Sequence, residues 1–280
     1  MRKFDDSAQL LLLAAFAIGS TLVISTILLS NIIYASNMAS ESTSDISNYE
    51  ISNIAQMADE ATRAAYYNAT NNRTVPINES VFTQYMDSYA TEASALYAFQ
   101  GYSFSFDNST LSDAYFTENG LYEGNPEWVL VKNISQTNKF MIDLTNTSKL
   151  GDASNAYEVR AINQSGTSIW FMKVYNDSSN ITITVPGQTY SKTGSNIYLN
   201  ITGNEINGGA SDFNFGASTA SDIYKIKFVN SSNAMGYYSI SGGLADGDTF
   251  VEERYKVVNA TISVASSNNK INVSIPITVP

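Results

Sequence analysis

Two short motifs in this sequence have the residue types of a serine-enzyme active site. Ser267 and Lys270 have Ser-x-x-Lys spacing, and Lys192-Thr193-Gly194 copies a motif found beside the nucleophile in one class of serine enzymes. In that class the serine opens a helix and precedes Lys-Thr-Gly, whereas Ser267 follows it and lies in a predicted hairpin turn. The order and the setting indicate coincidence, so neither motif predicts nucleophilic catalysis.

Two acidic pairs are the other candidates for chemistry. Asp246 and Asp248 stand in a Gly-containing turn where carboxylates could bind Ca²⁺, and Glu252 and Glu253 could be offered as a glycosidase pair. Neither pair belongs to a full signature, and acidic turn residues are usually only solvated. No phosphate-binding loop, dinucleotide fingerprint or Gly-x-Ser-x-Gly motif occurs. We therefore expect a protein without enzymatic activity, cofactor or metal.

The residue types that are missing narrow the chemistry further. The chain has no cysteine, so no disulfide can stabilise it and no thiolate can attack a substrate. It has no histidine, the commonest general base and a frequent transition-metal ligand. The net charge of −11 disfavours a phosphate-backbone ligand, because such ligands need clustered Lys and Arg. Nucleic acid is therefore not an expected partner.

The most frequent chemical motif is the Asn-x-Ser/Thr acceptor of N-glycosylation. The chain contains 13 such motifs without proline at x, whereas its composition predicts roughly six by chance. The acceptors are Asn68, Asn72, Asn78, Asn108, Asn133, Asn146, Asn163, Asn176, Asn180, Asn200, Asn230, Asn259 and Asn272. Accidental matches also occur in polar, turn-rich chains, so the position of the acceptors along the chain is more informative than their number. All of them follow the apolar run described next.

An apolar run near the N-terminus predicts a membrane span. Leu10 to Tyr34 are 25 residues without a charge, about 37 Å as a helix, and a hydrocarbon core is about 30 Å thick. The alternatives are a buried core helix and a cleavable secretory signal, but the run is too long for the latter and lacks its small-x-small exit. Arg2 and Lys3 precede the run, and the only charged residues in the 28 positions after it are acidic. This asymmetry places the N-terminus inside the cell and the rest outside.

Four segments follow from these patterns. We expect a cytoplasmic leader or N-terminus over 1–8, a transmembrane or assembly helix over 9–35, a helical stalk with a second helix over 36–101, and an extracellular β-domain over 102–280. Helical spacing of apolar residues supports the stalk at Ile46, Tyr49, Ile54, Met57, Ala61 and Ala64, and the second helix at Phe82, Tyr85, Tyr89, Ala93 and Leu96. The polar stretch from Asn68 to Asn78 separates the two helices, and Gly101 is placed to end the second.

From about residue 102 the apolar period changes to two, which predicts strands. The clearest are 128–131, 140–144, 157–162, 169–175, 181–185, 197–201, 224–229, 237–240, 250–258, 261–264 and 271–279. Turn-forming clusters such as residues 163–166 and 207–209 separate them. The fold class is therefore α+β, with a long N-terminal helix and a second helix followed by a mainly antiparallel, β-sandwich-like domain.

The strands also test the glycan hypothesis. Alternation puts Asn180, Asn200, Asn259 and Asn272 out of phase with their apolar neighbours, which is the polar face that a bulky sugar requires. Pro276 removes a hydrogen-bond donor from the last strand, so that strand is predicted at a sheet edge.

The whole arrangement resembles archaeal type IV pilin-like proteins. A short basic N-terminus, an apolar helix entered through Ala8-Gln9-Leu10-Leu11, a helical continuation and a C-terminal β-domain rich in Asn and Thr carry the resemblance, whose only sequence motif is residues 7–13. In that family a class III peptidase cuts just before the apolar stretch, which the resemblance places between Ala8 and Gln9. Asp5, Asp6 and Leu13 depart from the family, which usually has a basic residue beside the cut and often Glu at the fifth position after it. An uncleaved anchor that keeps residues 1–8 is therefore the alternative.

Two functions remain open at this point. A filament subunit would bundle its helix with identical copies, using an apolar surface and small residues for close contacts. Such positions are Leu10, Ala14, Ala15, Ala17, Gly19 and Ser20. A single-pass surface glycoprotein would instead display its β-domain for adhesion or for contact with a cell-wall lattice. The expected partners are membrane lipid and copies of the same chain, at the cell membrane or in a filament at the cell surface.

Overall fold

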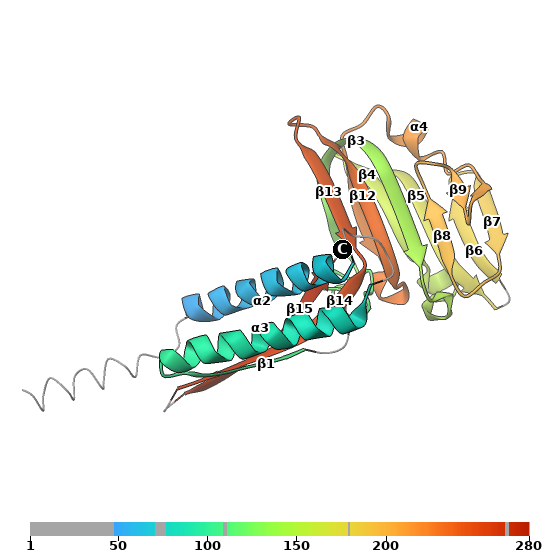
Figure 1. Ribbon diagram of the computed structural model, residues 1–280. Coiled ribbons are helices and arrows are strands. Elements are labelled where there is room, and N and C mark those ends of the chain that lie inside the picture. Colours follow the sequence, from blue (N-terminus) through green and yellow to red (C-terminus); the bar gives the residue numbers. More distant parts are fainter. Residues whose placement is uncertain (1–47, 71–76, 109–110, 179, 267–268, 280) are drawn as a thin grey trace, which may run out of the picture.

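The structure is a computed structural model that describes residues 48–70, 77–108, 111–178, 180–266 and 269–279 (Figure 1). Within these ranges the predicted β-rich, mainly antiparallel fold with helices is confirmed. The long N-terminal helix predicted over 9–35 lies outside the described residues. None of the helices that the structure does describe is long and apolar enough to cross a membrane.

Two helices and a small sheet form the part that we call the helical lobe. Helices α2 (Asn48–Ala69) and α3 (Glu79–Phe99) lie side by side along a sheet with the strand order β1-β14-β15. These strands are β1 (Ser103–Asn108), β14 (Lys256–Ala265) and β15 (Lys270–Val279), and β2 (Ser112–Asp113) also pairs with β14. The lobe is elongated and projects from the larger sheet (Figure 1).

The boundaries of α3 follow from its sequence. Asn78 caps the start, because its side-chain oxygen accepts a hydrogen bond from the backbone N–H of Val81 at 3.3 Å. Gly101 adopts φ +82°, and the N–H of Tyr102 donates to the carbonyl of Tyr97 at 3.0 Å. This is the Schellman arrangement, in which glycine ends the helix as predicted.

The other eleven strands form one curled sheet, which we call the distal lobe. Its main path runs β10-β9-β8-β3-β11-β4-β5-β6-β7, and β12 joins β3 to β13. The strands are β3 (Trp128–Leu144), β4 (Tyr157–Asn163), β5 (Ser168–Asp177), β6 (Asn180–Val185), β7 (Gln188–Lys192), β8 (Ile197–Asn200), β9 (Glu205–Ile206), β10 (Gly209–Ala210), β11 (Tyr224–Val229), β12 (Gly236–Leu244) and β13 (Thr249–Arg254). A short helix, α4 (Phe215–Thr219), closes one end.

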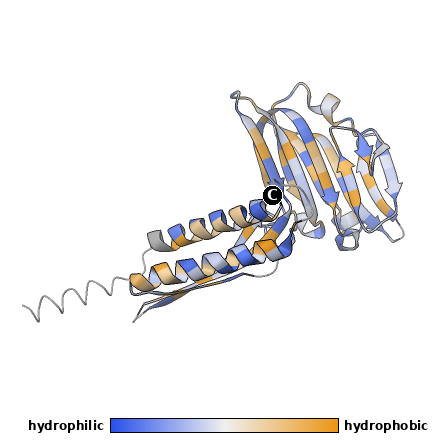
Figure 2. Ribbon diagram, in the orientation of Figure 1, coloured by the Kyte–Doolittle hydropathy of each residue, from blue (hydrophilic) through white to orange (hydrophobic). Residues whose placement is uncertain are grey.

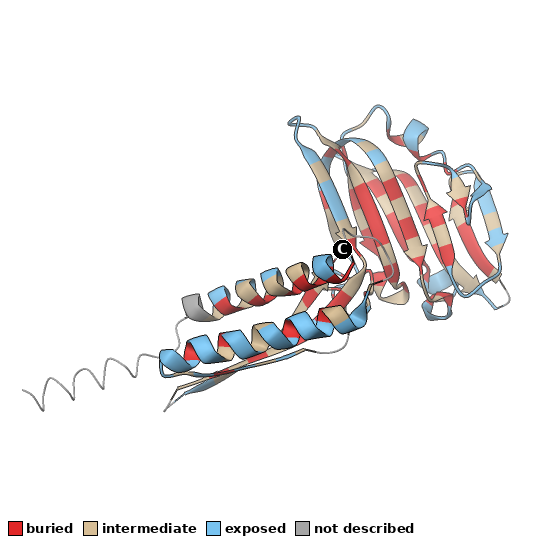
Figure 3. Cartoon of the chain, in the orientation of Figure 1, coloured by how far each residue is buried: buried red, intermediate tan, exposed pale blue. Residues whose placement is uncertain are grey.

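The distal lobe encloses one apolar core. Alternate residues of its strands are buried, as for Trp170, Met172 and Val174 on β5 (Figure 3). Figure 2 shows the matching stripes of hydrophobic residues across the strands. Aromatic rings connect the two sides of the curl: Phe228 on β11 meets Tyr238 on β12 edge to face, at 5.4 Å between ring centroids.

Several predicted strand boundaries differ from the structure; for example, the predicted strand 261–264 is part of a longer strand, β14. The segments 128–131 and 140–144 belong to a single strand, β3, which accommodates a bulge at Asn133 with φ +62°. The predicted strand 250–258 is instead divided at Tyr255, and its halves enter different sheets. Residues 252–256 include no glycine, proline or asparagine that would indicate a turn, so only tertiary contacts reveal the break. Pro276 lies on β15, which among the described strands pairs with β14 alone, and its predicted edge position is confirmed.

Candidate functional site

The residues predicted for assembly and processing lie outside the described part of the chain. These are Ala8, Gln9, Leu10, Ala14, Ala15, Ala17, Gly19 and Ser20. Their roles stay predictions. The described candidates are the glycan acceptors and the acidic and basic side chains of the two lobes.

Five of the 12 acceptors in the described ranges are exposed. They are Asn68, Asn78, Asn133, Asn259 and Asn272. The strand positions explain two of them, because Asn259 and Asn272 alternate with apolar residues that face α2 and α3. The side chain of Asn78 combines two roles: its oxygen caps α3, while its amide nitrogen is the atom that N-glycosylation would modify.

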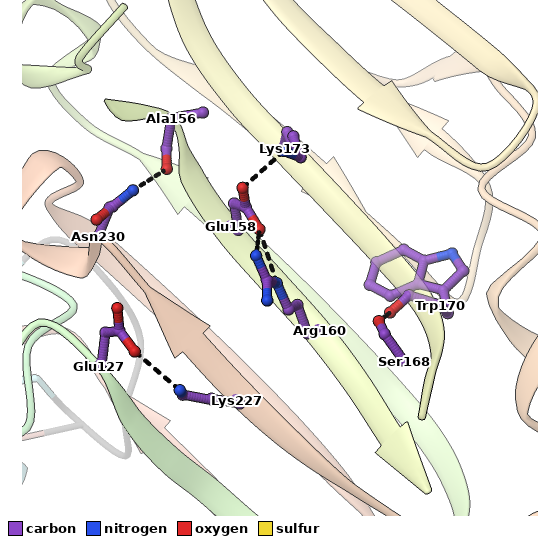
Figure 4. A network of polar contacts seen from close by, with 9 residues as sticks. All are labelled: Glu127, Ala156, Glu158, Arg160, Ser168, Trp170, Lys173, Lys227 and Asn230. Atoms are coloured by element: carbon purple, nitrogen blue, oxygen red, sulfur yellow. Dashed lines mark hydrogen bonds and ion pairs between the residues drawn. The ribbon is translucent and has the colours of Figure 1, made fainter. Parts of the chain in front are cut away.

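Three half-buried acceptors use their amide nitrogen within the fold. The Nδ2 atom of Asn230 donates to the carbonyl of Ala156 at 3.0 Å (Figure 4). The Nδ2 atom of Asn163 lies 3.4 Å from a carboxylate oxygen of Asp222. The Nδ2 atom of Asn200 lies 3.5 Å from a carboxylate oxygen of Glu205. A sugar on these nitrogens would have to share the space with an existing partner. They are therefore poorer acceptors in the folded protein than the exposed group.

Three further acceptors gather at one end of the distal lobe. Asn176 and Asn180 line a hollow of about 200 Å³ together with Thr147, whose predecessor Asn146 is also an acceptor. The oxygen of Asn146 accepts hydrogen bonds from the N–H and hydroxyl of Ser148. Asn108 is half-buried at the end of β1, and Asn72 lies outside the described residues.

The candidates for catalysis do not form a site. Asp246 and Asp248 are exposed in the β12–β13 turn, where Asp246 accepts from the N–H of Asp248. Glu253 accepts from the Ser239 hydroxyl at 2.9 Å, whereas its neighbour Glu252 is exposed. Lys192 ends β7, and Ser267 lies outside the described residues. No cluster of acidic residues that could hold a metal ion occurs in the ranges that the structure describes.

A cluster of charged side chains on the distal lobe links two neighbouring strands. Glu158 is 7% exposed, and its carboxylate lies 2.8 Å from Lys173 Nζ and 2.5 Å from an Arg160 nitrogen (Figure 4). Burial alone would raise the pKa of Glu158, but the two cations outweigh it and lower the pKa. Neighbouring strands β4 and β5 supply all three side chains, so the cluster joins two strands rather than forming a pocket.

Sequence reasoning missed the junction between the lobes. The buried guanidinium of Arg254 donates to the backbone carbonyls of Thr117 and Glu118, and it stacks over the Trp128 ring, 5.2 Å from its centroid. Burial lowers the pKa of Arg254. The only sequence signal is a single arginine between two acidic residues and an aromatic one, which is too common to predict this role.

A second polar contact completes the junction. Asp113 on β2 accepts from Lys256 at 2.5 Å and from the Thr145 hydroxyl at 2.7 Å. Burial would raise the pKa of Asp113, but these hydrogen bonds outweigh it and lower the pKa. Burial and the charge of Asp113 raise the pKa of Asp143 nearby. Asp113 and Lys256 are paired on neighbouring strands of the helical lobe's sheet, and Thr145 directly follows β3, so the Thr145 hydrogen bond links that sheet to the distal lobe.

Comparison with known proteins adds no relative: no family model, curated protein or solved structure matches this chain.

Proposed function

We propose that this protein is a non-catalytic structural subunit of a pilus-like extracellular filament, assembled through its N-terminal apolar helix. One observation carries the proposal. The start of α2 packs with the end of α3 at the outer end of the helical lobe, and the distal lobe lies at the other end (Figure 1). The uncharged run Leu10 to Tyr34 ends only 13 residues before α2 begins. The helical lobe thus spaces the β-rich lobe from an apolar segment that needs lipid or an identical neighbour.

The residue types of the N-terminal apolar run and of the distal lobe support these two roles, assembly and surface exposure. The run from Leu10 to Gly19 carries small residues suited to close helix contacts, and it has no charge that would oppose bundling. In the described ranges between residues 128 and 254, the large apolar side chains that are exposed are Ile223 and Val251, which is a small number for a docking surface. A filament with an apolar helical core and a polar, glycan-bearing coat fits both features.

Filament formation can be tested by mild shearing of cells. We expect the protein to sediment as fibres, and an Ala17→Asp variant to lose them, because a carboxylate inside a helix bundle has no partner. Ser88→Asp, which places the same group on the exposed face of α3, is the matched control and should leave fibres intact. Fibres that persist in Ala17→Asp would contradict assembly through this helix.

A second function has support from the polar surface of the distal lobe. A single-pass surface glycoprotein for adhesion or cell-wall contact needs only the anchor and this surface, without polymerisation. The mature N-terminus separates the two: a start at Gln9 supports the pilin-type pathway, and a start at Met1 supports a permanent anchor. The anchored protein would stay in detergent-solubilised membranes as a monomer or dimer.

The glycan hypothesis predicts an order of occupancy. In protein from the native host, peptide mass mapping should find more hexose on Asn272, which is exposed, than on Asn230, whose amide already donates to Ala156. Asn200, on the polar side of its strand, should fall between them. Unmodified peptides at every acceptor would remove the glycoprotein assignment.

A further inference from the structure

The end of α3 has an apolar surface that is exposed in the part of the chain that the structure describes. Of its last residues, Ala95, Leu96, Ala98 and Phe99 are all exposed, and Leu96 and Phe99 reach 56% and 91%. We call these four residues the apolar tip. The end of α3 beside the start of β1 is hydrophobic in Figure 2 and exposed in Figure 3.

The apolar tip differs from the rest of the same helix. The exposed residues over the first two-thirds of α3 are mostly polar and include Glu79, Asp87 and Glu92. Residues 93–106 then contain no charge at all. The exposed surface of α3 therefore changes from charged to apolar along its length.

Packing and hydrogen bonds position the tip. Tyr97 and Phe104, on either side of the turn, are buried and stack with ring centroids 5.0 Å apart. The hydrogen bond from Tyr102 N–H to the Tyr97 carbonyl fixes the turn between them. Phe99 is the last residue of a helix whose end is closed by these hydrogen bonds.

The position of the apolar run indicates what covers the tip. Ile51 at the start of α2 packs in the same cluster as Tyr97 and Phe104, so α2 begins at this end of the lobe. The 13 residues between Tyr34 and α2 reach at most about 45 Å. The distal lobe is about 33 Å farther away, the length of 22-residue α2. The tip therefore lies at the end of the helical lobe where α2, the first described element after the apolar run, begins.

We propose that the apolar tip contacts the membrane surface, with Leu96 and Phe99 in the interface between headgroups and acyl chains. This inference rests on the membrane-anchored form of the proposed function. Aromatic and aliphatic side chains are favoured at that depth. A chain of net charge −11 is repelled by anionic lipid, and a charge-free tip minimises this repulsion. Asn272, exposed on the sheet face opposite the helices, would keep a sugar in water and limit the contact to the end of α3.

The test uses the full chain in phosphatidylcholine vesicles whose acyl chains carry bromine near the headgroup. A Phe99→Trp variant should show blue-shifted emission and stronger bromine quenching than wild type, whose two tryptophans lie in the distal lobe. Val251→Trp, at a 62% exposed position on β13, is the matched control and should show neither change. Added salt should not reverse the effect, because the tip has no charge.

The outcomes separate this inference from the proposed function. A Phe99→Trp chain that floats with the vesicles but leaves the introduced indole unquenched overturns the tip contact and leaves the anchor standing. A chain that does not float overturns both. A blue shift that depends on protein concentration and occurs without lipid assigns the tip to a second copy and overturns the lipid contact. Circular dichroism of each variant shows that the fold is intact.

Discussion

The two lobes reach stability in different ways. In the distal lobe, eleven strands curl around one continuous core that buries large aromatic side chains such as Trp170 and Phe228. The helical lobe has two smaller clusters, where one face each of α2 and α3 meets three strands. Because burial of apolar area dominates folding free energy, the distal lobe has the larger reserve.

The two lobes also differ in which parts of the chain form them. The distal strands, residues 128–254, are inserted between β2 and β14 of the helical lobe's sheet. The helices therefore pack on strands from the far end of the chain. Val258 and Ile262 on β14 are examples of the residues that they contact. The helical lobe is completed only by the C-terminal strands, whereas the distal lobe contains its own core.

The largest effect should come from the distal core. Trp170 is fully buried, its ring meets Phe215 at 4.9 Å between centroids, and its Nε1 donates to the Phe213 carbonyl at 2.7 Å. Trp170→Ala should lower the free energy of unfolding by about 4 kcal/mol. Urea denaturation of the full chain in mild detergent, followed by near-ultraviolet circular dichroism, measures it.

A matched variant separates packing from hydrogen bonding at this position. Trp170→Phe keeps a ring but loses the indole N–H, so it should cost less than Trp170→Ala. Equal losses in both variants would mean that the hydrogen bond, and not the packed ring, dominates there.

An intermediate effect is expected in the helical lobe. Met86 is fully buried between α3, α2 and the sheet, and Met86→Ala should cost about 3 kcal/mol. The unfolding midpoint should fall when it is followed by circular dichroism at 222 nm, where helices give a strong signal. The midpoint followed by the near-ultraviolet signal of the distal lobe should stay unchanged. Gln84→Ala, on the exposed face of the same helix, should be within about 0.5 kcal/mol of wild type. A common shift of both signals would show that the junction makes the lobes one cooperative unit.

The smallest effect is expected at the junction. Asp113→Asn removes the ion pair with Lys256 and should cost about 1 kcal/mol near neutral pH. The pKa of Asp113 is lowered in the folded state, so its contribution is present above the ordinary carboxyl value and is lost as pH falls through the folded pKa. The variant should therefore approach wild type in acid, as urea titrations across pH will measure. A difference that grows in acid would contradict this assignment.

A neighbouring carboxyl limits the size of that effect. The pKa of Asp143 is raised by burial and by the charge of Asp113, so the charged form of Asp143 opposes folding at neutral pH. Removing the Asp113 charge relieves part of this cost. The Asp113→Asn loss should thus be smaller than the ion pair alone would give.

Local sequence patterns predicted much of the fold. The alternation of buried residues in β5 and β15, the glycine end of α3 and the edge position of Pro276 all follow from rules that act over a few residues. The same alternation placed four acceptors on a polar face, and Asn259 and Asn272 are indeed exposed, whereas Asn180 and Asn200 are half-buried. It could not predict which half-buried acceptors have engaged amides, because the partners of Asn163 and Asn230 lie 59 and 74 residues away.

The sequence alone determined the uncharged run, the acidic balance, the acceptor positions and the periods of the helices and strands, because each is set by composition or by neighbours within one or two turns. Only the tertiary structure decided that the chain leaves one sheet for another at Tyr255, that Arg254 is buried against the carbonyls of Thr117 and Glu118, and that Phe99 is left exposed. Each of these depends on contacts between segments far apart in the chain, and a periodic pattern records which face is apolar without recording what will cover it.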